Sequence, residues 1–223
     1  NNNGLNDIMC AGSPSSITGS GNTYSTQTCG VSLSVGNCYV DYITSCGTDI
    51  TRNGMTYIIP YTFTAPDLFD GTCINVSADN VVIKGTPLII GGTAIIGAPQ
   101  ISDPSQFIGT GVGIKGRKNI TLSGLSITNF NIGVDVDSNN LTNIIGNRIV
   151  SNGLYGLIIQ GNSVSTNVTN NNVCLNEGSG TASLDINCIS TGIVRGIGNT
   201  AGGSGGSGNY IGPSCTTLGF SSC

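Results

Sequence analysis

The sequence predicts an all-β protein, a single-stranded parallel β-helix (β-solenoid) that follows an irregular, disulfide-rich N-terminal region. The first observation is compositional, because 35 of the 223 residues are Gly and only 8% are charged. The poor helix formers Gly, Asn, Ser and Thr make up about half of the chain. The second observation is that short, strand-sized apolar runs lie between Gly and Asn turn signals. The third is that these runs repeat about every 22 to 24 residues.

Three motifs make up this repeat. The first reads Asn, apolar, spacer, apolar, Gly and occurs at 79–85, 118–124 and 139–146. The second ends at Ile127, Ile149 and Val173. The third occurs at 111–116, 132–137, 155–160 and 182–187. One period therefore holds about three short strands, and stacked coils share one core. We expect this stack to contain Val112, Ile114, Val134, Val136, Leu157, Ile159, Leu184 and Ile186. Asn at the bends tolerates left-handed backbone and can form hydrogen bonds along the axis.

The chain divides into three segments by composition. Residues 1–56 are a Cys/Ser/Thr-rich N-terminal region, 57–200 the parallel β-helix, and 201–223 a Gly/Ser-rich tail with Cys215 and Cys223. Residues 47–70 are expected to cover the first coil, and the stretch 1–37 could add a strand to a neighbouring subunit. The aromatic side chains before the regular coils predict cap packing by Tyr57, Tyr61, Phe63 and Phe69.

The segments YIIPYTF, GTCINVSADNVVIKG, GVGIKGRKNITLSGLSITNFNIGVDV and IIGNRIVSNGLYGLIIQGN resemble right-handed parallel β-helix proteins of the pectin-lyase-like superfamily. The resemblance covers about two thirds of the chain. It implies a right-handed coil but no single activity, since the superfamily includes lyases, hydrolases, adhesins and structural proteins. The chain has no His and lacks the four motifs of the polygalacturonase-type hydrolases.

Cysteine use and sequons predict a secreted, extracellular glycoprotein. Disulfides in an oxidising compartment are the favoured interpretation, with candidates Cys10, Cys29, Cys38, Cys46, Cys73, Cys174, Cys188, Cys215 and Cys223. The odd number of cysteines suggests a free thiol or a bond between subunits. The predicted glycosylation sites are Asn75, Asn119, Asn140 and Asn167. The first ten residues lack the basic and apolar parts of a signal peptide, so we interpret them as a mature N-terminus.

Several partners are excluded or unexpected. Seven scattered cations cannot neutralise a nucleic-acid backbone, and no apolar run is long enough to span a membrane. We assign no catalytic residue, no metal ligand and no cofactor. Asp135 and Asp137 are the weak candidates for a Ca²⁺ site, with Asp185 two coils away.

The alternation in 132–137 places both of these carboxylates on the solvent face, in an outward row of Lys115, Asp137, Gln160 and Asn187. The favoured interpretation is a surface ion pair between Lys115 and Asp137. In the pectate lyases that the chain resembles, a nearby Lys or Arg acts as base, and Lys115, Arg117 or Arg148 would take that role here.

These sequence features predict two candidate functions. The first is a structural protein that self-assembles into an extracellular filament, coat or matrix. The second is a protein that binds or cleaves extracellular polysaccharide, as a lyase if it is an enzyme. The missing catalytic residues and the amide- and hydroxyl-rich surface favour the first.

Overall fold

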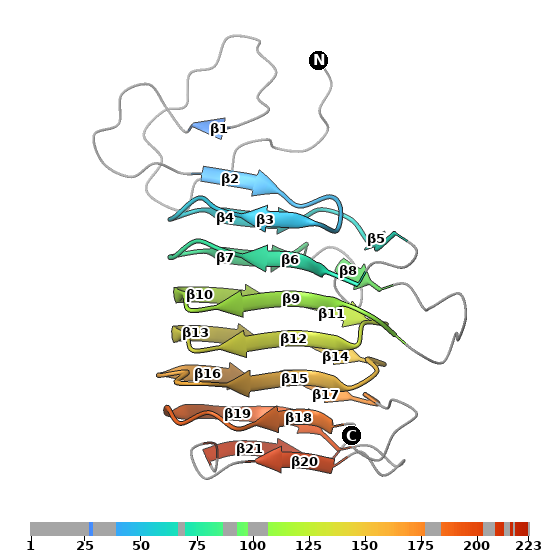
Figure 1. Cartoon of the computed structure of the whole chain (residues 1–223), viewed down its shortest axis with the longest axis vertical. Helices are drawn as coiled ribbons and strands as arrows, with labels where there is room; N and C mark the ends of the chain where they lie inside the picture. The colour runs from blue at the N-terminus through green and yellow to red at the C-terminus, as the bar shows by residue number, and fades with distance from the viewer. Residues whose placement is uncertain are drawn as a thin grey trace.

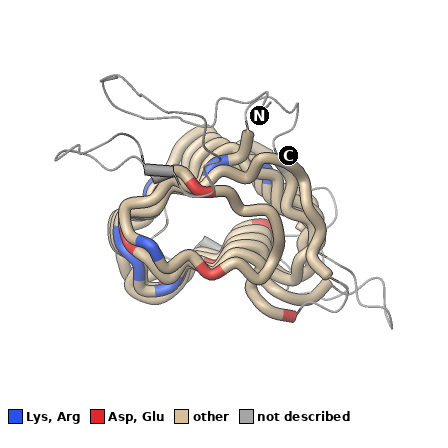
Figure 2. The backbone as a smooth tube through the Cα atoms, turned by 90° about the horizontal axis from the view of Figure 1, so that it is seen from above, with Lys and Arg blue, Asp and Glu red and all other residues tan. Residues whose placement is uncertain are grey.

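The computed structural model describes residues 27–28, 39–66, 70–86, 93–97, 107–176, 184–202, 208–211, 215 and 217–222. These residues form a stack of coils, with one strand layer above the next along the long axis (Figure 1). Seen along that axis, the backbones of the successive coils superpose (Figure 2). The predicted all-β parallel β-solenoid is therefore confirmed. No helix in the described part of the chain is both long and apolar enough to cross a membrane.

The strands form two sheets. The seven-stranded sheet has the order β20 (Gly208–Ile211), β18 (Leu184–Cys188), β15 (Tyr155–Gln160), β12 (Ile132–Asp137), β9 (Thr110–Lys115), β6 (Thr72–Val76) and β3 (Thr48–Ile50). The fourteen-stranded sheet has two arms that meet at β19 (Val194–Ala201), with which β21 (Thr217–Ser221) also pairs. Each coil from β3 up to β18 therefore places one strand in the seven-stranded sheet and one in each arm, whereas β19 pairs with both arms.

The first arm contains β1 (Gln27–Thr28), β2 (Tyr39–Tyr42), β4 (Thr56–Ile59), β7 (Val82–Gly85), β10 (Lys118–Ser123), β13 (Asn140–Ile145) and β16 (Thr166–Thr169). The second arm contains β5 (Phe63–Thr64), β8 (Thr93–Ile96), β11 (Leu125–Thr128), β14 (Arg148–Val150) and β17 (Asn172–Cys174). Among the described residues, all strand pairs are parallel except that of β1 with β2. Parallel pairing begins with β2 at Val40, inside the range 1–56 that the sequence assigned to the N-terminal region.

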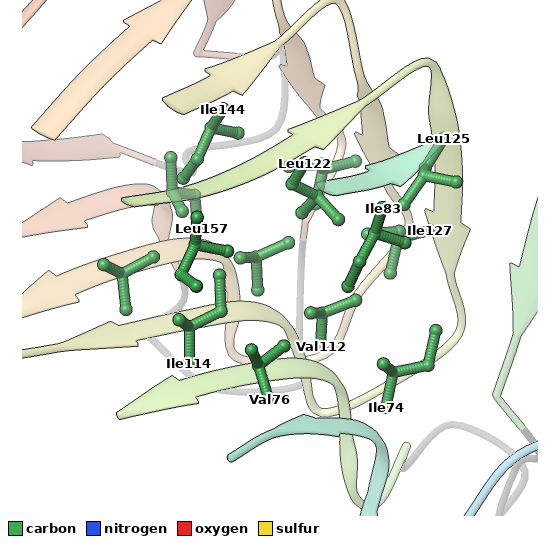
Figure 3. Close-up of a cluster of buried hydrophobic side chains, with 14 of the residues drawn as sticks. Ile74, Val76, Ile83, Val112, Ile114, Leu122, Leu125, Ile127, Ile144 and Leu157 are labelled. Carbon is green, nitrogen blue, oxygen red and sulfur yellow. The ribbon is translucent and has the colours of Figure 1, made fainter. Parts of the chain in front are cut away.

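The apolar stack that the sequence predicts lies between the sheets. Val112, Val134 and Leu157 are register neighbours, and all three are fully buried. The inward side chains of the seven-stranded sheet meet those of both arms in one continuous core (Figure 3). The other two motifs also align as predicted, for Leu122 lies between Ile83 and Ile144, and Ile149 lies between Ile127 and Val173.

The predicted register is wrong by two residues in β18. Leu157 pairs with Ile186 and Ile159 with Cys188, whereas Leu184 pairs with Tyr155 and is only half-buried. Because side chains alternate along a strand, a shift of two residues keeps the same residues facing inward. The alternating sequence Leu184, Ile186, Cys188 therefore fits either register, and the longer spacing before β18 hides the correct one.

Three buried ladders of polar side chains, here called the amide ladders, connect successive coils. They contain Asn147–Asn171–Asn199, Asn152–Asn176–Asp185 and Asn139–Ser163–Ser190. In the first, the backbone N–H and Nδ2 of Asn147 donate to Oδ1 of Asn171, at 2.9 and 3.0 Å. Asn171 donates to Asn199 in the same way, at 3.0 and 3.1 Å. The expected bonding of Asn along the axis is thus confirmed.

The corner before each asparagine of the ladders has left-handed backbone. Gly146 (φ 63°), Asn170 (φ 54°) and Gly198 (φ 68°) precede the three asparagines of the first ladder. This conformation turns the chain so that the next side chain points inward, and Gly or Asn adopts it at low cost. Leucine adopts this conformation at two positions, at Leu175 (φ 58°) before Asn176 of a ladder and at Leu141 (φ 57°) before Thr142.

Two disulfides join neighbouring coils near the two ends of the stack. Cys46, just before β3, is bonded to Cys73 of β6, and Cys188 of β18 is bonded to Cys215. Each closes a loop with a sequence separation of 27. Cys174 is disulfide-bonded as well. The remaining predicted cysteines, Cys10, Cys29, Cys38 and Cys223, lie outside the described residues.

Candidate functional site: the outer face of the seven-stranded sheet

The predicted polar row lies on β9, β12 and β15. Lys115 pairs with Asp137, and Asp137 pairs with Gln160, as the repeat predicts. Asn187 does not continue this row. The register of β18 places it beside Ile158, in the row of Asp135. The outer face therefore has two adjacent rows, one through Asp135 and one through Asp137.

The ion pair forms with a different carboxylate from the predicted one. Nζ of Lys115 lies 3.1 Å from Oδ2 of Asp135, and Nε2 of Gln160 donates to Oδ1 of the same carboxylate at 3.0 Å. Asp135 is only 5% exposed, so its predicted place in solvent is wrong. The side chains of Lys115 and Gln160 reach it from the coils on both sides. Asp137 instead accepts a hydrogen bond from the hydroxyl of Ser138 at 2.8 Å.

The carboxylates suggested for Ca²⁺ do not share a site. One oxygen of Asp135 faces an ammonium group, and Asp185 points into an amide ladder. Asp185 accepts hydrogen bonds from the backbone N–H and Nδ2 of Asn176 and from the N–H of Gly202. Among the described residues, no three His, Cys, Asp or Glu side chains are grouped to hold a metal ion.

Only one of the three suggested bases faces a carboxylate. Arg117 donates from Nε to the carbonyl of Lys115 and from a terminal nitrogen to that of Ser77, both at 3.0 Å. Its guanidinium therefore holds adjacent coils together. Arg148 lies on β14 in the second arm, so it is not on the sheet that carries Asp135. Lys115 is the remaining base candidate, and its ammonium is paired.

Two features of this region were not predicted. On the N-terminal side of the face, Nδ2 of Asn75 donates to Asp49 and to Ser77, and the Ser77 hydroxyl also donates to Asp49. Figure 2 also shows several Lys and Arg residues gathered on one side of the stacked coils. On this part of the stack, Asn53, Asp79 and Lys118 lie in three successive coils, since the N–H of Asp79 donates to Asn53 and the N–H of Lys118 donates to Asp79.

The aromatic residues near the first coils have different surroundings. Tyr57 and Phe63 pack in the core, which agrees with the predicted packing role, whereas Tyr61 is exposed. Phe69 lies outside the described residues. Burial raises the pKa of Tyr57 above the usual value of 10.0, the negative charge of Asp41 raises it further, and Arg52 opposes both. Tyr57 is therefore a neutral core residue at physiological pH.

Comparison with protein families, curated proteins and solved structures finds no match to this chain. The parallel β-solenoid therefore stands on the strand pairing itself.

Proposed function

We propose that the chain is a secreted, glycosylated structural subunit that self-assembles into an extracellular filament, coat or matrix. The observation that carries the proposal is the bonding between successive coils. Three buried amide ladders run along the axis, and disulfides join neighbouring coils near both ends. Bonds of this kind resist separation of the coils. A structural protein outside the cell needs this resistance to unfolding.

The compartment and the finer classification belong to the same proposal. The disulfides Cys46–Cys73 and Cys188–Cys215 are compatible with an extracellular location. The repeat motifs support a place in the right-handed, pectin-lyase-like superfamily, whose structural members provide the precedent. The chain is rich in amides and hydroxyls, and only 8% of its residues are charged.

Strand addition between copies is the proposed mode of assembly. Within the described residues, β3 and β20 are the two terminal strands of the seven-stranded sheet. The N–H of Ser77 donates to the carbonyl of Ile50 at 2.8 Å, so the backbone groups of Ile50 face β6. Those of the preceding residue, Asp49, face the open side of the sheet. A strand of another copy placed there would continue the parallel ladder.

A matched pair of variants at Asp49 tests this mode. Asp49→Pro and Asp49→Ala both remove the hydrogen bonds to Asn75 and Ser77, but only proline removes the outward N–H. Electron microscopy and light scattering should show assemblies for the wild type and Asp49→Ala, and none for Asp49→Pro. Equal assembly of all three would reject addition at β3, and a monomeric wild type would reject self-assembly itself.

A second candidate is binding or cleavage of an extracellular polysaccharide. Lys115 favours it, because the side chain is 62% exposed on the outer face beside Asp135 and Gln160. A lyase acting on acidic polysaccharide would release unsaturated products that absorb in the ultraviolet. We expect no such products from the wild type or from the Asp135→Asn, Asp137→Asn double variant. Activity in the wild type that the double variant lacks would replace the structural proposal.

A further inference from the structure

The four glycosylation sequons fall into two groups by position. Asn119, Asn140 and Asn167 lie on β10, β13 and β16, which are consecutive hydrogen-bonded strands of the first arm. Asn75 lies on β6 in the seven-stranded sheet. Three sequons in three successive coils therefore share one side of the solenoid, and the fourth lies on another.

The side-chain amide of Asn75 forms two hydrogen bonds, one of which joins neighbouring coils. Its Nδ2 donates to Oδ1 of Asp49 at 2.9 Å and to Oγ of Ser77 at 3.0 Å, which uses both amide hydrogens. The Ser77 hydroxyl, which completes the sequon, donates to the same Asp49 oxygen at 2.6 Å. An N-linked glycan replaces one amide hydrogen, so it would break one of these bonds beside the Cys46–Cys73 disulfide.

The other three amides can carry a glycan without this loss. Asn119 is exposed and donates once from Nδ2, to Oδ1 of Asn80 at 3.0 Å, so one hydrogen remains. Asn167 accepts from the hydroxyl of Thr169 at 2.9 Å, an interaction that does not involve Nδ2. In the described part of the chain, neither Nδ2 of Asn167 nor the exposed side chain of Asn140 has a hydrogen-bond partner.

The sequon of Asn140 has a further property. Its threonine, Thr142, is 0% exposed, and the hydroxyl has no hydrogen-bond partner in the described structure. Thr142 pairs with Ile120 of the preceding coil and faces the interior. A transferase that recognises Asn-x-Thr needs that hydroxyl, so it can modify Asn140 only before this coil has closed. Thr121 and Thr169, in the sequons of Asn119 and Asn167, remain partly exposed.

We propose that the folded, secreted protein carries N-linked glycans on one side of the solenoid, at Asn119, Asn140 and Asn167, because a chain glycosylated at Asn75 loses a structural amide and folds less well. Asn140 receives its glycan before the chain folds. This inference rests on the secretion and glycosylation in the proposed function. It leaves the outer face of the seven-stranded sheet bare.

Site occupancy in secreted protein is the first test. The full chain is produced in a secretory host that glycosylates Asn-x-Ser/Thr, and the sites are mapped by mass spectrometry after enzymatic release in heavy-oxygen water. Among secreted molecules, occupancy at Asn75 should be about tenfold below that at the other three sites, because chains that carry a glycan there fold without one of these hydrogen bonds. Equal occupancy at Asn75, or an empty site among the other three, would overturn the proposal.

The timing is tested on unglycosylated full chain made in a host without this pathway. A purified oligosaccharyltransferase is given the chain either folded and oxidised or reduced and denatured. We expect modification of Asn140 in the denatured chain only, and modification in the folded chain would refute the buried-hydroxyl argument.

Variants of the unglycosylated chain separate a structural role from a modification. Asn75→Gln should lower the thermal midpoint, whereas the matched Asn167→Gln should leave it unchanged. Equal midpoints for the two variants would contradict a structural role for the Asn75 amide.

None of these measurements depends on assembly. A monomeric protein with the expected glycan pattern would therefore refute the proposed self-assembly and leave this inference intact.

Discussion

At the scale of single residues, backbone strain and burial decide the properties of the turns. Leu141 adopts left-handed backbone with φ 57° and is 52% exposed. For a residue with a Cβ this conformation costs about 1–2 kcal/mol, and asparagine tolerates it better. The backbone conformation of Leu141 therefore destabilises the folded protein locally.

Replacing this leucine with asparagine is expected to stabilise the protein. Leu141→Asn should raise the unfolding free energy by about 1 kcal/mol through relief of strain. Ile193→Asn is the matched control, because Ile193 is 54% exposed on the same corner and does not have a positive φ. Chemical denaturation of both variants measures the difference. A gain of equal size in the control would show that removal of an exposed apolar side chain, and not strain, is responsible.

The buried phenol of Tyr57 predicts a loss of stability at alkaline pH. Its pKa in the folded protein is raised above 10.0, so the folded state disfavours the phenolate. Stability from this group is complete below pH 10.0 and falls as the pH rises through the higher folded value. The unfolding free energy of the wild type should decrease more steeply above about pH 10 than that of Tyr57→Phe. Parallel pH curves for the two proteins would contradict the assignment.

At the scale of elements, the amide ladders hold the corners in place. Asn171 receives two hydrogen bonds from Asn147 and donates to the carbonyl of Ile144 and to Asn199. Its removal leaves several buried polar groups unpaired. Each such group costs about 1–3 kcal/mol, which is far more than a surface contact contributes.

A neighbouring pair of asparagines tests this contribution. Asn171→Ala should destabilise the protein by about 2–4 kcal/mol, the loss expected from a buried hydrogen-bond network. Asn172→Ala, at the exposed next position, should change stability by less than about 0.5 kcal/mol. Unfolding of both variants in denaturant supplies the comparison, and similar losses would mean that the ladder adds little.

The sequence could predict the coils but not every contact between them. Repeated motifs fix which residues share a phase, and so Val112, Val134 and Leu157 were placed correctly. The register of β18 was not accessible, because its alternating pattern fits two positions. The partner of Lys115 was also missed. Residues in direct register are easy to identify, whereas a long side chain can reach diagonally to Asp135 on the next strand.

At the scale of the whole molecule, the solenoid is nearly one-dimensional, because each coil contacts mainly its two neighbours. Its stability should therefore be local, and the disulfide Cys46–Cys73 should protect the first coils most. A closed loop of this size contributes about 3 kcal/mol in the chain-entropy description. The central coils depend instead on the core and the amide ladders.

Hydrogen exchange with mass spectrometry can show this locality. In a Cys46→Ala, Cys73→Ala double variant, protection should fall in β3 and β6 and remain unchanged in β12 and β15. The corresponding variant of Cys188 and Cys215 should lose protection in β18 and keep it in β6. A uniform loss along the axis in either variant would indicate that the stack unfolds as one cooperative unit.

The end of one amide ladder restricts how the protein could change in length. The side chains of Asn152 and Asn176 each accept from one coil and donate to the next, but the carboxylate of Asp185 only accepts. An additional coil with its own asparagine fits between Asn152 and Asn176, where it receives and passes on the same bonds. Past Asp185 the ladder has no side-chain N–H that could donate to a further coil. Duplication or deletion of whole coils during evolution, or by a protein engineer, is therefore expected within the ladder and not beyond its carboxylate.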